Sequence, residues 1–294
     1  MENLKEAFFN FVGAFADSFR GNASGLTWIH FLVLLAIIFF IAGVVTSVMA
    51  FLKKRKTMSF WRKKFSTSAL DTLKFEEPEW KIEFSGKETS IFSSKIGGIP
   101  YWCVKNSAKP YPVGKSGKKM MLLAQINLSK ECLGSPFPDK GLLQIFIDVA
   151  CEKYGFDSDE RVLSGGHKVV YHSKIDSSVT PSDIIALGGV PVSTDPNLSG
   201  SPLRNAEFSL SFHSHKASLK GSTHHLLGFP SFSKKDPRDE KGFYNGKKYD
   251  TVLFELHSEM YEDILWGNGG TGTFLINRDD LMKKDFSNVL FNYE

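Results

Sequence analysis

Four of the eight histidines lie close together in the sequence, at spacings that suit metal ligands. His213 and His215 alternate along a segment predicted as a strand, so both side chains point to one face, and His224 and His225 follow after a short polar segment. Imidazole binds zinc and other divalent metals, with His257 or a carboxylate as a further ligand. The sequence leaves two interpretations open: a metal site built on these histidines, or a polar strand face exposed to solvent.

Two glycine-containing segments resemble phosphate-binding loops but lack the required context. Residues 267–272 satisfy G-x-G-x-x-G, a motif that binds dinucleotides when its last glycine opens a helix. Strand-type residues follow here, which predicts a glycine-rich hairpin or bulge. Gly114-Lys115-Ser116 lacks the first glycine of a Walker A loop, because Lys109 occupies that position. We predict no cofactor, with a divalent metal as the alternative, and the sequence leaves enzymatic activity undecided.

The distribution of cysteine and charge argues against cysteine-based sites and against nucleic-acid binding. Cys103, Cys132 and Cys151 are sparse, odd in number and without a C-x-x-C pair, which excludes a zinc knuckle or a redox motif and favours a reducing compartment over a disulfide framework. The net charge of +4 arises from one short basic run. The rest of the chain is nearly neutral, so we predict no nucleic-acid partner.

Residues 25–52 predict a transmembrane helix, because they are apolar on every helical face and His30 is their only ionisable residue. At 1.5 Å per residue this segment spans about 40 Å, against a hydrocarbon core of about 30 Å. The apolar run is too long for a cleaved signal peptide, and its positive charges follow it instead of preceding it. Residues 1–24 precede the helix as a tail whose phenylalanines recur at helical spacing, which predicts an amphipathic segment.

Seven basic residues and no acidic ones lie between positions 53 and 64, directly after this helix. The positive-inside rule then places the C-terminal part in the cytoplasm and the N-terminal tail outside, which predicts a single-pass protein of the cell (inner) membrane. One helix face is lined with small residues, which suits a homodimer formed through Ala36, Gly43, Ser47 and Ala50. The composition of membrane helices in general explains this face equally well.

After a basic juxtamembrane segment and linker at 53–79, residues 80–294 predict one soluble domain. Its class is α+β, with a largely antiparallel β-sheet and short helices. We expect strands at 120–126, 142–148, 207–213, 252–256 and 273–276. Short helices are expected to begin near Ser129, Pro181 and Asp279.

The same domain resembles the YwqG-like family, a mainly bacterial domain of unknown function. The resemblance rests on SKIGGIPYW at 94–102, LLAQIN at 122–127, FPDKGLLQ at 137–144, HLLGFP at 225–230, KDPR at 235–238 and Trp266-Gly267. It covers residues 80–294 and implies an α+β domain with no established activity, cofactor or catalytic residue. Cys103 replaces a common proline and Asn268 a common aspartate, and the second change removes a carboxylate from that loop.

We take five glycine and tryptophan residues in or beside these segments as candidate ligand-binding residues: Trp102, Gly228, Trp266, Gly267 and Gly269. Glycine allows close approach to the backbone, and an aromatic ring can form the wall of a pocket. We expect their segments to converge on one concave surface, the alternative being that they are turn and core residues. The favoured hypothesis is a membrane-anchored binding module for a protein or small-molecule partner. A metal-assisted hydrolase using the histidines is the alternative.

Overall fold

The computed structural model describes residues 79–86, 88–104, 110–193, 200–215 and 224–294. The chain divides into two compact units, Met1–Leu73 and Lys74–Glu294, and every described element belongs to the second. The predicted tail, membrane helix and basic segment lie outside the described residues. Within the described part, no helix is both long and apolar enough to cross a membrane.

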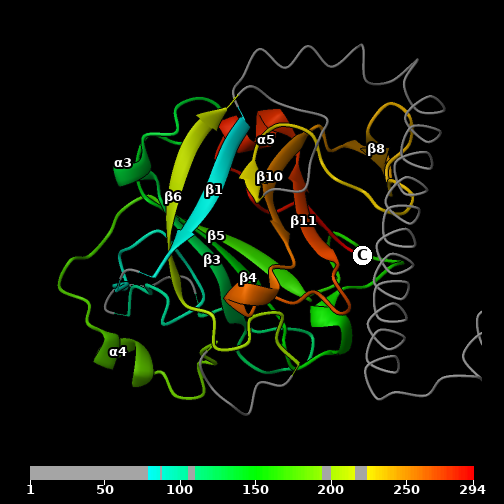
Figure 1. The fold of residues 1–294 in the computed structure, drawn as a ribbon. Helices are drawn as coiled ribbons and strands as arrows, with labels where there is room; N and C mark the ends of the chain where they lie inside the picture. Colours follow the sequence, from blue (N-terminus) through cyan, green and yellow to red (C-terminus); the bar gives the residue numbers. More distant parts are fainter. Residues whose placement is uncertain (1–78, 87, 105–109, 194–199, 216–223) are drawn as a thin grey trace, which may run out of the picture. The chain divides into compact units, whose positions relative to one another are not determined.

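An antiparallel ten-stranded sheet dominates this unit (Figure 1). Its strands are β1 (Glu79–Ser85), β2 (Lys95–Ile96), β3 (Met121–Asn127), β4 (Leu142–Ile147), β5 (His167–His172), β6 (Phe208–His215), β7 (His225–Leu226), β10 (Thr251–His257), β11 (Thr271–Ile276) and β12 (Val289–Tyr293). Their order across the sheet is β12-β11-β10-β7-β1-β6-β2-β3-β4-β5. A separate short pair joins β8 (Phe243–Tyr244) to β9 (Lys247–Lys248). The prediction of a largely antiparallel sheet is confirmed.

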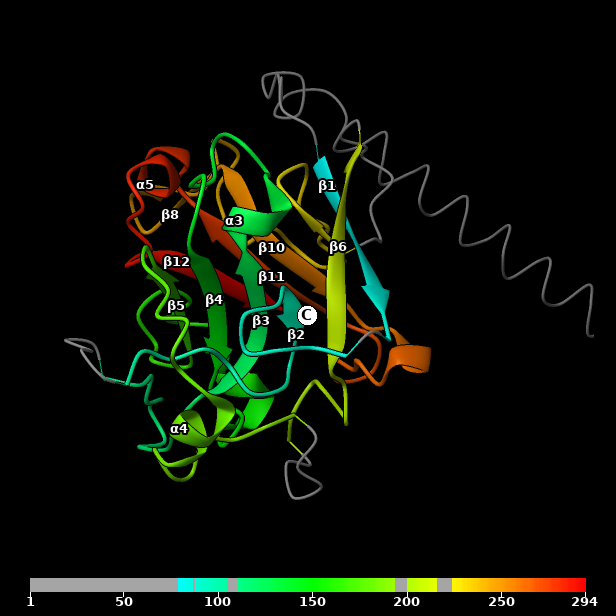
Figure 2. The same cartoon turned by 90° about the vertical axis from the view of Figure 1, so that its left-hand side faces the viewer.

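Among the residues that the structure describes, the helices are few and short, and the views in Figures 1 and 2 place α3, α4 and α5 around the sheet. They are α3 (Leu128–Glu131), α4 (Pro181–Ile185) and α5 (Arg278–Met282), with 3-10 turns at Glu152–Gly155 and Met260–Glu262. Thr180 and Asp183 form a reciprocal capping box at the start of α4, and the Asn277 side chain caps α5. All three predicted helix starts are confirmed to within two residues.

Apolar side chains pack on both faces of the sheet. The main core contains Leu143 and Ile145 of β4 together with Phe254 and Leu256 of β10. Phe146, the next residue along β4, belongs instead to a second cluster on the opposite face. Because side chains alternate along a strand, β4 contributes to two apolar layers, and its sequence reads as a nearly continuous apolar run.

The sheet curves so that its two edge strands approach each other. His167 Nε2 of β5 lies 2.8 Å from the Val289 carbonyl oxygen of β12. Just before β5, the Arg161 carbonyl accepts a hydrogen bond from the Phe291 amide at 2.9 Å. These contacts connect the first and last strands in the order of the sheet without forming a regular ladder.

Two buried glutamines fix the segment at 91–101 to the sheet. Gln125 donates to the carbonyls of Ile91 and Ser93 and accepts from the Tyr101 amide, with distances of 2.8–3.0 Å. Gln144 donates to the Tyr101 carbonyl and to Gln125 Oε1, both at 2.7 Å. Every such bond satisfies a group that would be costly to bury alone, so this segment is held by polar contacts as well as by packing.

Candidate functional site

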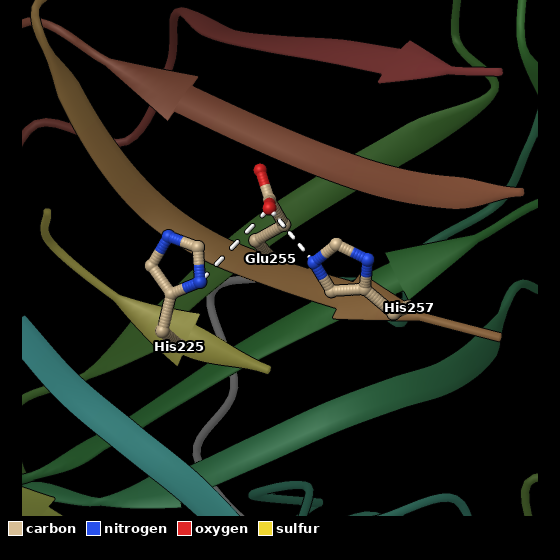
Figure 3. Close-up of side chains that lie close together, drawn as sticks. All are labelled: His225, Glu255 and His257. Carbon is tan, nitrogen blue, oxygen red and sulfur yellow. Dashed lines mark hydrogen bonds and ion pairs between the residues drawn. The ribbon is translucent and has the colours of Figure 1, made fainter. Parts of the chain in front are cut away.

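Three side chains that can bind a metal meet beside β10, and Figure 3 shows them in close-up. Glu255 and His257 come from β10, and His225 comes from the neighbouring short strand β7. The strand register places Glu255 directly opposite His225. The two residues of β10 are separated by one position, so both point to the same face of the sheet.

That face is the one opposite the main core. Leu226, Phe254 and Leu256 alternate with the three site residues and belong to the main core, so the site residues face outward. Glu255 and His225 are nevertheless buried, with 0% and 1% of their side chains exposed, and His257 is partly buried, with 14% exposed.

The loop that follows β7 contacts this site. The Ser231 amide donates to both carboxylate oxygens of Glu255, at 3.2 and 3.0 Å. Leu227 and Gly228 turn the chain with φ angles of 59° and 68°, a conformation in which glycine has no steric penalty. A Cβ atom on Gly228 would also lie 2.5 Å from Glu79 Oε2. Gly228, predicted to bind a ligand, therefore shapes the turn into this loop.

The separations between the three side chains suit one small cation. His257 Nε2 lies 2.9 Å from Glu255 Oε1, and His225 Nδ1 lies 3.9 Å from the same oxygen. The ligand atoms of all three residues lie within 4.8 Å of one another. Two ligands of a tetrahedral zinc ion, each about 2.0–2.1 Å from the metal, are about 3.3 Å apart. Side-chain adjustments of less than about 1 Å would therefore bring most of these atoms into a coordination sphere.

The second nitrogen of each histidine contacts an oxygen that can fix its protonation. His225 Nε2 lies 3.2 Å from the Phe229 carbonyl, to which it can only donate, so in the neutral ring Nδ1 is the nitrogen with the lone pair. His257 Nδ1 lies 3.0 Å from the Thr271 hydroxyl, which can accept its proton when Nε2 binds a metal. Such outer contacts are typical of histidines that ligate metals.

Glu255 is a buried carboxylate held in its charged form. Burial acts to raise its pKa, but the hydrogen bond with His257, the charge of His225 and the Ser231 amide together outweigh burial and leave the pKa below its usual value. Thr273 also donates a hydrogen bond to Oε2 at 3.1 Å. The site therefore presents a negative oxygen to any cation that enters it.

The Ser231 hydroxyl oxygen is buried and has no hydrogen-bond partner among the described residues. It belongs to the residue whose amide binds Glu255, so it lies beside the site. An unpaired buried hydroxyl costs about 1–3 kcal/mol. A further ligand of a bound metal, such as a water molecule, would be a partner for it.

His224 supports this cluster from the side. Its Nδ1 accepts a hydrogen bond from the His257 amide at 3.1 Å, and its ring contacts Phe84 with centroids 4.5 Å apart. Burial, and then the neighbouring charges of His257 and His225, lower its pKa to about 3. We therefore assign His224 a supporting role and no role as a ligand.

The other two predicted metal ligands are not members of the cluster. His213 lies on β6, 58% exposed, with its Nε2 3.5 Å from Glu83 Oε2. His215 ends the same strand opposite Glu79. Of the four histidines predicted as ligands, the structure brings His225 into the cluster and places His224 beside it.

The predicted ligand-binding segments do not meet on one surface. Trp102 packs against Tyr111 and Phe146 in the second apolar cluster, whereas Trp266 packs against Phe291 in the main core, on the other face of the sheet. The turn around Gly228 lies near the start of β10, where the Leu227 amide bonds to the Val252 carbonyl.

The glycines of the 267–272 segment lie at the far end of β10, about 20 Å away along that strand. The Ser258 amide, just after β10, bonds to the Gly270 carbonyl. Gly267 and Gly269 have φ angles of 55° and 92°, and the Gly267 amide donates to the Tyr154 hydroxyl at 2.7 Å. The sequence predicts a glycine-rich hairpin or bulge here, and the structure has a glycine-rich turn that leads into β11.

An open depression of about 580 Å³ lies elsewhere, among residues 235–246. Its most buried cation, Arg238, is bound to the Asp236 carboxylate at 2.7 Å and to the Tyr249 carbonyl. Because Arg238 is already bound within the protein, we place the candidate site instead at His225, Glu255 and His257.

Glu255 is the functional candidate that the sequence interpretation did not name. A signal was present, because Glu255 is the one acidic residue in the otherwise apolar run at 252–256 and stands two positions before a histidine. A charge within a buried strand is costly unless it is paired, so it marks a candidate site.

Comparison with known proteins gives a family but no activity. The model of a family described as "Domain of unknown function (DUF1963)" matches residues 94–294, which is more than half of the chain. No curated protein matches the chain.

Proposed function

We propose that this chain, which belongs to the family of domains of unknown function DUF1963, is a membrane-tethered module that binds a divalent transition metal, Zn²⁺ in the first place, through His225, Glu255 and His257. The observation that carries the proposal is the convergence of two imidazoles and one charged carboxylate in a buried site. Two histidines and a glutamate form one of the ligand sets that zinc uses in proteins.

A plain ion pair explains less of this arrangement. An ion pair needs only Glu255 and one histidine, 2.9 Å apart as His257 is. It leaves the second imidazole facing the same carboxylate oxygen at 3.9 Å, and it leaves the buried Ser231 hydroxyl without a partner. A metal accounts for both features, since it uses both imidazoles as ligands and can carry a further ligand toward Ser231.

Binding fits the burial of the site better than catalysis does. Three protein ligands leave a coordination position open, as in catalytic zinc sites. The ligands are no more than 14% exposed, however, and the loop at 229–231 contacts them on the outer side. A substrate would have to displace that loop, so we propose metal binding and do not propose hydrolysis.

The tether is the second part of the proposal, and it is supported by sequence alone. The apolar segment at 25–52 and the basic run at 53–64 are those of a single-pass inner-membrane protein whose C-terminal domain is cytoplasmic. We also propose the narrower assignment to the YwqG-like family, on the signature segments at 94–102 and 225–230.

Metal analysis of the purified full chain in detergent tests the metal site. After chelator treatment, loading with Zn²⁺ and dialysis, elemental analysis is expected to find about one zinc per chain. Glu255→Gln, which keeps the shape of the side chain but removes its charge, is expected to lower this to about 0.1 or less, because a neutral amide is a poor zinc ligand.

His213→Ala is the matched control, since this histidine lies outside the cluster and is largely exposed, and it is expected to keep full occupancy. Circular dichroism of each variant verifies that it folds. Wild-type protein that retains no zinc after loading, or a Glu255→Gln variant that retains it fully, would disprove the site.

A further inference from the structure

Strand β7 is the link between two parts of the sheet. On one side it pairs with β1, through Trp80 with Leu226 and Lys81 with His225. On the other side it pairs with β10 at a single register position, Glu255 with His225. By contrast, β10 and β11 pair from Thr251 to His257, over the whole length of β10. The boundary between β7 and β10, here called the seam, therefore contains few ladder hydrogen bonds.

The three C-terminal strands depend on this seam for their ladder connection to the rest of the sheet. Strands β10, β11 and β12 follow one another in the chain and pair in the same order. At the other edge β12 meets the β5 region through separate bonds, such as Phe291 to Arg161, and not through a ladder. Their other polar contacts with the rest of the sheet lie outside any ladder. They join β12 to Arg161 and His167, and the connection between β10 and β11 to Tyr154 and residues 202–204.

The candidate metal ligands lie on the two sides of the seam. His225 belongs to β7, whereas Glu255 and His257 belong to β10. Two backbone donors of the seam stand beside them: the Leu227 amide bonds to the Val252 carbonyl at 2.8 Å, and the His257 amide bonds to His224 Nδ1 at 3.1 Å. An ion bound by all three ligands would join the two strands directly.

We propose that the bound metal acts as a latch across this seam, so that metal occupancy decides how tightly the unit β10–β12 is held to the rest of the sheet. The inference rests on the proposed metal site. A metal that binds only when the seam is closed stabilises the closed form, because opening must release it. The effect is local, since the ligands cross only this boundary.

Hydrogen–deuterium exchange of the full chain in detergent tests the latch. In chelator-treated protein, the seam amides of Leu227, Ser231 and His257 are expected to exchange at least about tenfold faster than those of β3 and β4, through local opening of the seam. Zinc is expected to slow the seam amides about tenfold or more, with a smaller change in β3 and β4. Glu255→Gln is expected to abolish the response, and His213→Ala to retain it.

The outcomes separate the two proposals. If one zinc binds per chain but leaves exchange at the seam unchanged, the latch is wrong and the metal site stands. The same conclusion follows if the seam exchanges as slowly as β3 and β4 without zinc. If no zinc binds, both proposals fall. If Glu255→Gln does not fold, His225→Gln replaces it, and this variant is likewise expected to abolish the response to zinc.

Discussion

At the scale of single residues, His167 shows what burial does to a titratable group. Its ring lies in the core beside the stacked rings of Phe274 and Phe291, with centroids 5.9 and 5.5 Å away. Nε2 contacts the Val289 carbonyl, and Nδ1 has no hydrogen-bond partner among the described residues. Burial lowers the pKa of this histidine to about 4, so the folded protein holds it neutral.

His167 makes stability dependent on pH in the acidic range. Its folded pKa of about 4 lies below the unfolded value of 6.5, so the unfolded chain binds more protons between these values. The stability contribution is complete above pH 6.5 and is lost as pH falls toward 4, with a full size of about 3 kcal/mol. We expect denaturant titrations of the metal-free chain, followed by tryptophan fluorescence, to show this loss.

His167→Gln is the informative variant, because its amide can still donate to Val289 but does not titrate. It is expected to remove roughly half of the loss of stability between pH 7 and pH 4.5, whereas His213→Ala on the exposed strand β6 is expected to leave the loss unchanged. His224, whose pKa is about 3, also lowers the stability of the folded protein as the pH falls, in the wild type and in both variants. An equal loss in His167→Gln and wild type would contradict the assignment.

At the scale of elements, the turn after β7 decides where the outer loop lies. Gly228 has a positive φ angle, and its Cα lies so close to Glu79 that a Cβ atom has no room. The turn brings Phe229 and Ser231 back over the face that carries His225 and Glu255. The backbone geometry of this turn therefore determines which loop groups contact His225 and Glu255.

Gly228→Ala and Gly246→Ala distinguish the cost of the backbone conformation from the effect of the contact with Glu79. Both glycines have φ near 70–80°, but a Cβ atom on Gly246 meets nothing within 4 Å. We expect Gly246→Ala to cost about 1 kcal/mol for the backbone conformation alone, and Gly228→Ala to cost about 2 kcal/mol because Glu79 must also move. Only Gly228→Ala is expected to weaken zinc binding, as measured by competition with a chromogenic chelator. Equal effects of the two variants on zinc binding would show that the loop position does not matter.

At the scale of the whole molecule, the prediction that matters most concerns topology. The apolar run at 25–52 is followed by seven basic residues, and the family domain occupies 94–294. We expect a reporter that works only in the cytoplasm to be active when fused after Glu294, and a reporter that works only outside to be inactive. Replacing all seven basic residues with glutamine is expected to give mixed orientations. Activity of the outside reporter in the unchanged protein would reverse the predicted orientation.

Strand and helix positions followed from local sequence wherever the pattern was strong. The alternation at 207–213 and the apolar runs at 120–126 and 142–148 correspond to β6, β3 and β4. Strands β1, β5 and β12 were not predicted, although Trp80, Ile82 and Phe84 alternate along β1. The two-residue strands β2 and β7 could not be predicted, because such short segments are strands only through the neighbours with which they pair.

Local sequence was sufficient to predict the class of fold, the helix that begins at Thr180-Pro181, the lack of a dinucleotide loop at 267–272 and the candidacy of His225. These depend on local propensity and spacing, which a single chain segment contains. Local sequence did not give the cap of α5, which is Asn277 and not the predicted Asp279. The meeting of His225 with Glu255 and His257, and the separate position of His213, follow from the three-dimensional arrangement of the strands. That outcome depends on strand order and register, since the pairing of β7 with β10 joins residues thirty positions apart. Alternation gives the face of each side chain, but only the register determines which faces meet.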